Sequence, residues 1–416
     1  MVSHISRRRV VVTGMGTVNP VGNTARETWE GLCAGKSGIA AVTRFDTSKC
    51  KTKIGGELKG FDPLRFVSAK EQRRTDEFII YALAAAEMAL EDAGLKIGKD
   101  NAERTGTIIG SGIGGLATVE KAKILLMERG PQALSPFMIP AVLANLAAGQ
   151  IAIRSGAKGP INCTVTACAS GAGAIGDAFR LIREGYADAM IAGGSEAVVT
   201  PLAFAGFNAM RALSVRNDRP EAASRPFDRD RDGFVIGEGS GIVILEELSS
   251  ALDRGAHVYA EISGIGMSSD AYHVAIPPPG HEGAARCMRL ALEDAGLEPS
   301  QIDYINAHGT STPPNDIYET QAIKAVFGKD TRVAVSSTKS MTGHLLGAAG
   351  GLETIITAMA VEKGTMPPTI NLDNPDSECD LDYVSGKARA RDIRAALSNS
   401  FGFGGVNVVL AFRKFE

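Results

Sequence analysis

Cys168 is the residue of this sequence best placed to do chemistry. It follows an apolar segment, 161–165, that predicts a strand, and it precedes Ala169, Ser170 and Gly171, which predict the start of a helix. A thiol is a nucleophile only as its thiolate, and an unperturbed cysteine has a pKa of about 8.5. A helix N-terminus favours the anion, so we expect this position to lower the pKa of the thiol. Free cysteines are also among the most buried residue types, so the segment alone fits a nucleophile and a structural thiol equally well.

Two histidines could act together with this thiol. His308 lies in the sequence NAHGTST and His344 ends the sequence SSTKSMTGH, both rich in small and polar residues. Each histidine follows a predicted strand, as Cys168 does, and sites in layered α/β proteins form at the carboxyl ends of strands. We therefore expect the three side chains to converge on one pocket. The other histidines, among them His281, lie at the terminus or in polar loop sequence without comparable context.

An internal repeat indicates how these residues are positioned. The sequence ALEDAGL occurs at 89–95 and again at 291–297. Each copy ends a predicted amphipathic helix with glycine at the C-cap position, and a short apolar strand and a glycine-containing loop follow. The repeat predicts two related α/β halves, residues 1–255 with the cysteine and residues 256–416 with both histidines.

The predicted strands are apolar runs rather than alternating patterns. Examples are 189–192 and 241–245, and helices such as 78–90 lie between them. Strands of this kind are buried on both faces, which is typical of sheets covered by helices. We therefore predict a layered α/β fold.

Composition and charge exclude several classes of function. The chain has 416 residues, 44% apolar and 22% charged, and a net charge of −3, so we expect a globular protein without an overall basic field for nucleic acid. No uncharged apolar stretch reaches the roughly 18 residues that a membrane span needs, and no segment near the N-terminus resembles a signal peptide. The six cysteines show no CxxC spacing and no His/Cys cluster suits zinc, so we expect no metal and a reducing, cytoplasmic location.

Three further motifs have competing interpretations. The sequence GSGIGG at 110–115 matches the GxGxxG pattern, but no acidic residue ends a clear second strand, which disfavours nicotinamide binding. The sequence DRDRDG at 228–233 resembles the start of a calcium loop but has glycine at the twelfth position, so we expect a structural turn with local Asp–Arg pairs. Lys70, Arg73 and Arg74 form a basic edge, which is either a solvated face or a contact for an acidic partner or phosphate.

Several motifs together resemble the β-ketoacyl-[acyl-carrier-protein] synthases. They are TACASG around the cysteine, HGT at His308, KSMTGH ending at His344 and NSFGFGG at 399–405; RPFDRDRDG and PPTINLD resemble the elongating enzymes of bacterial type II fatty-acid synthesis in particular. The resemblance implies a thiolase-like fold with duplicated halves in a five-layer α-β-α-β-α sandwich, usually a homodimer. It implies no cofactor, because the 4′-phosphopantetheine of acyl carrier protein carries the substrates.

The resemblance also assigns roles to individual residues. Cys168 would hold an acyl chain as a thioester, while His308 and His344 act on the malonyl thioester as its decarboxylation places negative charge on the oxygen. Lys339 matches a lysine that tunes the electrostatics of the histidine pair, and the N–H groups of Cys168 and Phe403 match an oxyanion hole. The other expected contacts are with pantetheine (Thr310, Thr312), with the acyl chain and its gate (Ile113, Phe401, Phe403) and with the acidic carrier protein (Lys70, Arg73, Arg74).

Two departures from the family pattern and two alternatives stay open. Asn315 stands where relatives usually have glycine, in a loop that we expect to keep a left-handed backbone, and Val406 replaces a common threonine without a functional account. A discrete polyketide ketosynthase would share every catalytic residue. A non-catalytic scaffold that binds carrier protein is disfavoured by Cys168, and an initiating synthase by His344.

Overall fold

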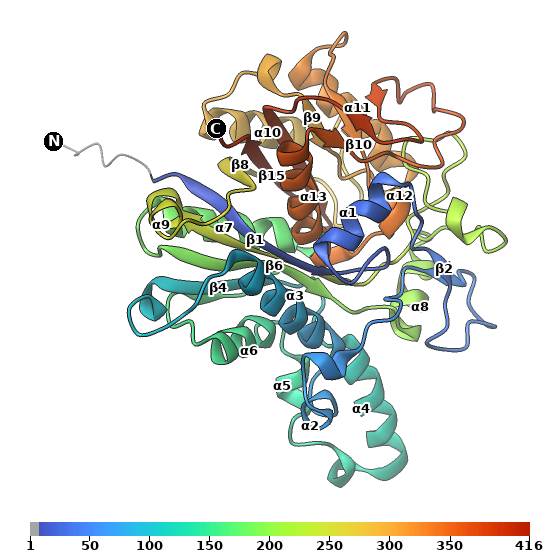
Figure 1. The fold of residues 1–416 in the computed structure, drawn as a ribbon. Coiled ribbons are helices and arrows are strands. Elements are labelled where there is room, and N and C mark those ends of the chain that lie inside the picture. Colours follow the sequence, from blue (N-terminus) through green and yellow to red (C-terminus); the bar gives the residue numbers. More distant parts are fainter. Residues whose placement is uncertain (1–7) are drawn as a thin grey trace.

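The computed structural model describes residues 8–416, so the first seven residues of the predicted N-terminal half lie outside the described part (Figure 1). The main strands of the N-terminal half are β1 (Val10–Val18), β4 (Thr105–Gly110), β5 (Ile161–Asn162), β6 (Ala189–Glu196) and β7 (Gly239–Glu247). Those of the C-terminal half are β8 (Ala260–Ser269), β9 (Tyr304–Asn306), β10 (Ala334–Ser336), β14 (Ala395–Gly402) and β15 (Val406–Arg413), with β12 (Asp382–Tyr383) at the edge. The helices that pack on these strands are α3 (Glu77–Ala93), α6 (Leu146–Ser155), α7 (Ser170–Arg183), α10 (Glu282–Ala295), α11 (Pro313–Phe327) and α13 (Ala349–Lys363).

Both halves have the same strand order and the same strand directions. The strands of the N-terminal half lie side by side in the order β5-β4-β6-β7-β1, and those of the C-terminal half in the order β10-β9-β14-β15-β8. If the main strands of each half are numbered one to five along the chain, both orders are 3-2-4-5-1. In each half the first two pairings are parallel and the last two antiparallel. The two units join where residues 10–12 of β1 pair with residues 260–262 of β8. The shared topology confirms the predicted duplication.

The helices form three layers around the two units. α7 and α13 pack between them, since α7 contacts β4 and β6 while α13 contacts β7 and β14; α3 covers the outer face of the N-terminal unit and α10 that of the C-terminal unit (Figure 1). Three hydrophobic clusters match these layers, and the central one contains Ile175 and Phe179 of α7 with Leu352 and Ile355 of α13. This arrangement is the five-layer α-β-α-β-α sandwich that was predicted.

The repeated sequence closes the same structural unit in both halves. It forms the ends of α3 and α10, which both stop at a glycine in the left-handed region, Gly94 (φ 61°) and Gly296 (φ 59°). Its aspartates anchor the first strand of each half: Asp92 accepts from the N–H of Met15 at 2.8 Å, and Asp294 from that of Ile265 at 3.0 Å. The repeated sequence therefore makes the same helix-to-strand contact once in each half.

The Gly14-Met15-Gly16 sequence belongs to that contact. A Cβ atom at Gly14 would lie 2.3 Å from the carbonyl oxygen of Ala89, and one at Gly16 would lie 2.0 Å from that of Ala85, both in α3. Glycine is required because strand and helix backbones touch at these positions.

The strand expected at 161–165 is wrong in length and in burial. β5 spans only Ile161–Asn162 at the end of the sheet, where it pairs with β4 alone. Ile161 and Val165 are 54% and 59% exposed, because no further strand or helix covers this edge within the described chain. An apolar run predicts burial, but within residues 8–416 this one stays exposed at the end of the sheet.

Candidate active site

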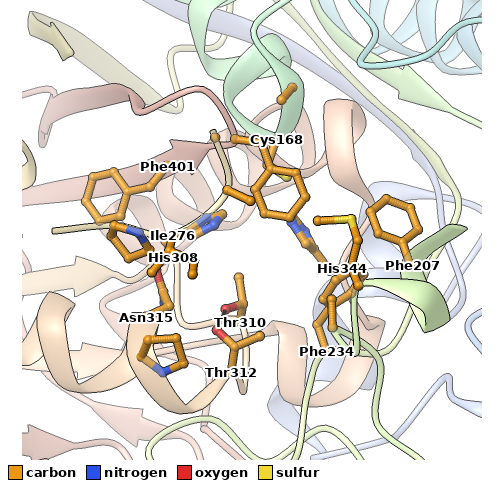
Figure 2. Close-up of a pocket in the computed structure, with 18 of the residues that line it drawn as sticks. Cys168, Phe207, Phe234, Ile276, His308, Thr310, Thr312, Asn315, His344 and Phe401 are labelled. Carbon is orange, nitrogen blue, oxygen red and sulfur yellow. Dashed lines mark hydrogen bonds between the residues drawn. The ribbon is translucent and has the colours of Figure 1, made fainter. Parts of the chain in front are cut away.

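One cavity of about 670 Å³ receives residues from both halves of the molecule. Figure 2 shows Cys168, His308 and His344 around the same open space, with Thr310 and Thr312 below it. The cysteine comes from the turn before α7, His308 from the loop after β9, and His344 from the segment after the short helix α12 (Lys339–Thr342) that follows β10. The expected site residues that line the cavity are Cys168, His308, His344, Thr310, Thr312, Ile113, Phe401 and Phe403.

A short strained turn presents the thiol of Cys168. The 3₁₀ turn Ala167–Ala169 leads directly into α7, and Ala167 has φ 50°, in the left-handed region that costs a non-glycine residue about 1–2 kcal/mol. The Ser170 hydroxyl holds the turn, accepting from the N–H of Thr166 at 2.9 Å and donating to the Ala167 carbonyl at 2.6 Å. The neighbouring structure thus fixes the direction of the Cys168 side chain.

The pKa of this thiol is not lowered as the sequence suggested. Burial raises the pKa of Cys168 to about 12, while the Lys339 ammonium and the backbone N–H of Phe403 act against the rise. The helix N-terminus also favours the anion, but the side chain is only 8% exposed and has lost the hydration that stabilises a thiolate. In this structure Cys168 is therefore a protonated thiol at neutral pH.

Backbone contacts position His308 and His344 from opposite sides. The N–H groups of His308 and Gly309 donate to the buried carboxylate of Glu319 at 2.9 and 2.8 Å. The N–H of His344 donates to the carbonyl of Val235 at 2.7 Å. The two rings lie 5.3 Å apart between centroids and nearly perpendicular, at 85°.

Both histidines are neutral at neutral pH. Burial lowers the pKa of His308 well below its ordinary value, and Lys339 and His344 add to the effect. Burial and Lys339 do the same to the pKa of His344. A neutral imidazole carries one N–H donor and one acceptor nitrogen, so the pair can offer two donors to the cavity without bringing charge into it.

Lys339 acts on the cavity without lining it. It starts α12 (Lys339–Thr342), its side chain is 2% exposed, and it forms an ion pair with Glu353 of α13. Burial raises the pKa of Glu353 to about 7, and the lysine opposes that rise. The position of Lys339 is therefore that of a fixed buried cation behind the two histidines.

The residues expected to bind pantetheine and the acyl chain lie at the cavity wall. The Thr310 and Thr312 hydroxyls are hydrogen-bonded to each other at 2.9 Å. Ile113 is 44% exposed and Phe403 37% exposed, whereas Phe401 is 6% exposed and packs its ring against that of His308 at 5.6 Å. Two aromatic rings and two hydroxyls thus border a largely apolar space.

The expectation of a left-handed backbone at Asn315 is wrong. Asn315 lies in the first turn of α11, which begins at Pro313 after the N-cap Thr312. The left-handed residue of this segment is Ser311, with φ 67°. Val406, the other departure from the family pattern, starts β15 and packs against the central hydrophobic cluster.

Lys70, Arg73 and Arg74 do not line the cavity but form an exposed basic edge. Lys70 lies in the short helix α2 (Ala69–Gln72), Arg73 caps it and Arg74 follows. The Arg74 guanidinium lies 4.3 Å from the ring centroid of Phe137. The three cations are thus presented to solvent together.

Sequence reasoning missed Glu196, which ends β6. Its buried carboxylate accepts from the N–H groups of Gly112 at 2.7 Å, Ile113 at 3.2 Å and Gly347 at 3.0 Å. Glu196 thereby joins the loop at 110–115 in the first half to the turn before α13 in the second half. The GxGxxG-like sequence at 110–115 is thus explained by this contact between the halves. The sequence feature that could have indicated this role is a glutamate at the carboxyl end of an apolar strand.

The calcium-like sequence also forms a structural turn. The Asp228 carboxylate accepts from Arg225 Nε at 3.0 Å and from the N–H groups of Asp373 and Asn374 at 2.9 and 2.8 Å.

Within residues 8–416, no group of three or more His, Cys, Asp or Glu side chains could hold a metal ion. No helix in this part of the chain is long and apolar enough to cross a membrane.

His281 also lines the cavity, although no motif surrounds it in the sequence. It is 1% exposed, and its ring packs against that of Phe401 at 4.8 Å. No local pattern marked it, because the contact depends on the approach of β14 from the far end of the chain.

Comparisons with known proteins agree with the fold. Residues 7–251 match the model of the β-ketoacyl synthase N-terminal domain, and residues 259–373 match that of the C-terminal domain. The chain is 56% identical over 415 residues to a 3-oxoacyl-[acyl-carrier-protein] synthase 2 of Synechocystis sp., covering 100% of both chains, and 52% identical to one of Coxiella burnetii, covering 99% of each.

Solved structures with the same fold include enzymes of two kinds. A β-ketoacyl synthase from Burkholderia phymatum has a TM-score of 0.91 and 37% identity, covering 98% of this chain and 100% of that one. A type II polyketide ketosynthase, solved in complex with its acyl-carrier protein, also has a TM-score of 0.91 and 37% identity, covering 99% of this chain and 100% of that one. The chain therefore belongs to the β-ketoacyl synthase family of condensing acyltransferases.

Proposed function

We propose that this protein condenses an acyl chain bound to Cys168 with malonyl-[acyl-carrier-protein], giving 3-oxoacyl-[acyl-carrier-protein] and carbon dioxide in fatty-acid elongation. The observation that carries the proposal is a single cavity that holds one buried thiol and two neutral histidines. A nucleophile and uncharged donors are what a thioester condensation needs, because the oxygen of each thioester becomes negative on the way.

The first step transfers the acyl chain to the protein. The sulfur of Cys168 attacks the thioester carbonyl of acyl-[acyl-carrier-protein], the new C–S bond forms, and the bond to the pantetheine sulfur breaks. The thiol proton ends on the released pantetheine sulfur, so the exchange needs no net proton. The N–H groups of Cys168 and Phe403 are the proposed donors to the oxyanion, and the position of Phe403 at the thiol supports this role.

The second step makes the carbon nucleophile. The malonyl carboxylate leaves as carbon dioxide, and its electron pair forms an enolate on the remaining thioester. We assign His308 and His344 as the donors to the enolate oxygen. Neutral rings suit this task, because a neutral donor stabilises the oxygen without attracting the carboxylate that must leave.

The third step joins the two carbons. The enolate carbon attacks the acyl carbonyl on Cys168, the C–S bond breaks, and the cysteine sulfur takes up one proton to restore the thiol. The Lys339 cation is proposed to keep both histidines neutral through this cycle, since it lowers the pKa of each. Lys339 is thus a positioning and electrostatic residue rather than one that touches substrate.

The remaining assignments concern how the substrates are held. Thr310 and Thr312 are proposed to bind the pantetheine amides, and Ile113, Phe401 and the gate residue Phe403 to border the acyl chain. Lys70, Arg73 and Arg74 are proposed to bind acyl carrier protein, an assignment supported by their shared exposure on one edge. The 4′-phosphopantetheine of that partner carries the substrates, and no resident cofactor is proposed.

We also propose a homodimer and a cytoplasmic location, with the two halves divided near residue 255. The sheet edge at β5 supports the dimer, because Ile153, Ile161 and Val165 are 82%, 54% and 59% exposed beside a strand whose outer edge no strand of residues 8–416 covers. A second copy of the chain could extend the sheet there. The six free cysteines support a reducing compartment.

A discrete polyketide ketosynthase is the second candidate function, and the solved polyketide ketosynthase complex favours it at the level of fold. Sequence identity weighs against it, since the chain is 52–56% identical to fatty-acid synthases over its full length but 37% identical to that ketosynthase. A non-catalytic scaffold would not need a thiol beside two neutral histidines.

The test is an assay of the purified protein with acyl carrier proteins that bear chains of graded length. We expect mass spectrometry to place an acyl adduct on Cys168 and on no other cysteine, and malonyl-[acyl-carrier-protein] to convert it to the 3-oxoacyl product. Cys163 is a matched control, because it lies five residues upstream but does not line the cavity. Absence of an adduct at every length would overturn the proposal.

A further inference from the structure

His281 is a third buried histidine at this cavity, in a backbone conformation that disfavours it. It precedes α10 with φ 44° and ψ 55°, the left-handed region where glycine fits without strain. The Nε2 atom lies 3.4 Å from the Asp270 carboxylate, and neither ring nitrogen forms a hydrogen bond of normal geometry. The backbone does not require histidine here, so the contacts of the ring must account for it.

The ring of His281 begins a file of four rings that ends at the proposed catalytic pair. Its centroid lies 4.8 Å from that of Phe401, and Phe401 lies 5.6 Å from His308. His308 in turn lies 5.3 Å from His344. Phe401 is therefore held between His281 on one side and His308 on the other.

Asp270 ties the same histidine to the segment that carries Phe403. One Asp270 oxygen faces His281, and the other accepts from the Asn407 amide at 2.7 Å. The N–H of Asp270 also donates to the carbonyl of Gly405 at 2.8 Å. His281 thus occupies the corner where α10, the end of β14 and the turn before β15 meet.

We propose that His281 is a positioning residue: its ring fixes Phe401, and through Phe401 it sets the orientation of His308 for the decarboxylation and condensation steps. The inference rests on the proposed function and deepens it. Misplacing a catalytic group by a fraction of an ångström affects the step in which that group acts. The first step, acyl transfer to Cys168, does not use His308 as a donor and should be spared.

The experiment compares the two half-reactions in His281→Gly. Glycine suits the left-handed backbone, so relief of backbone strain offsets part of the loss of the buried ring and the variant should still fold. With saturating malonyl-[acyl-carrier-protein], we expect kcat for condensation to fall about tenfold, a loss typical of a displaced catalytic group. The rate of Cys168 acylation should stay within about twofold of that of the wild type.

Three further variants show whether the ring acts through Phe401. His281→Asn keeps a polar group near Asp270 and tolerates the backbone, so it should behave like His281→Gly if the ring is what matters. The double variant His281→Gly/Phe401→Leu should be no slower in condensation than Phe401→Leu alone. Ala271→Gly is the matched control, because Ala271 also has a left-handed φ of 47° but is exposed, and it should leave both half-reactions unchanged.

The outcomes separate this inference from the proposed function. Equal losses in acylation and condensation, a condensation rate within twofold of wild type, or additive effects in the double variant would each overturn the role of His281. In those cases a wild-type protein that condenses its substrates would leave the proposed function intact. A wild-type protein that forms the Cys168 adduct but never condenses would overturn both.

Discussion

The starts of the two central helices have the same backbone but different chemistry. α7 follows the 3₁₀ turn Ala167–Ala169, and α13 follows the 3₁₀ turn Leu346–Ala348. Each turn opens on a non-glycine residue in the left-handed region, Ala167 with φ 50° and Leu346 with φ 48°. The next residue is Cys168 in the first half and Gly347 in the second.

The difference shows how duplication allowed the halves to specialise. At Cys168 the side chain reaches a cavity, whereas a Cβ atom at Gly347 would lie 2.3 Å from the N–H nitrogen of Gly112 and 2.6 Å from the Glu196 carboxylate. One turn therefore holds the nucleophile, and its counterpart packs against the first half and joins it through Glu196. The second half contributes the histidines from its other loops.

Removing the nucleophile should have the largest effect. In Cys168→Ala, condensation should fall by at least about a thousandfold, because no other group can hold the acyl chain. Decarboxylation of malonyl-[acyl-carrier-protein] should continue, since the histidines that stabilise the enolate come from the other half. Release of labelled carbon dioxide and formation of 3-oxoacyl product measure the two separately. Parallel loss of both activities would contradict this division of labour.

Adding a methyl group at the counterpart position should damage stability instead. Gly347→Ala should lower the free energy of unfolding by about 3 kcal/mol, because its Cβ atom would meet backbone that cannot move independently. Gly149→Ala in α6 is the control: the nearest atom to its Cβ would be 3.7 Å away, and alanine in a helix interior should stabilise by about 0.5–1 kcal/mol. Denaturation by urea measures both, and equal effects would be evidence against the tight contact at Gly347.

Removing the buried cation should change the pH dependence of the histidine step. In Lys339→Met/Glu353→Gln, neither partner is left as an unpaired buried charge. The cation lowers the pKa of His308 and His344, so its loss raises both values. Because the neutral rings are the active form, the acid limb of decarboxylation should move to higher pH. Lys339→Arg should keep the wild-type profile, and a double variant with an unshifted limb would show that the lysine is only structural.

The repeated aspartates should show the smallest and most informative difference. Asp294 pairs with Arg183 at 2.7 Å, whereas Asp92 accepts from the hydroxyl of Tyr259 and burial raises its pKa. Asp294→Asn should therefore cost about 1.5 kcal/mol, as for a hydrogen bond to a charged group, and Asp92→Asn less than about 1 kcal/mol. Urea midpoints at one pH test the order, and a larger loss at Asp92 would reverse it.

The sequence predicted features that depend on local patterns. The buried strands and the helix start after Cys168 each have signals within about ten residues, and the motifs around Cys168, His308 and His344 placed them at strand ends. The exposed β5 and the raised pKa of Cys168 could not be predicted this way, because both depend on which distant segments cover the residue. The same reason hid Glu196 and His281, whose contacts come from other strands and loops.

The burial of Cys168 also determines how the protein should respond to covalent reagents. The thiol is 8% exposed and is reached through the cavity, while five other cysteines are distributed over the chain. A small soluble electrophile reacts with thiolates, and this thiol is held protonated by its surroundings. Selective labelling therefore requires a reagent that first occupies the cavity, so that non-covalent affinity rather than electrophile strength decides which cysteine is modified.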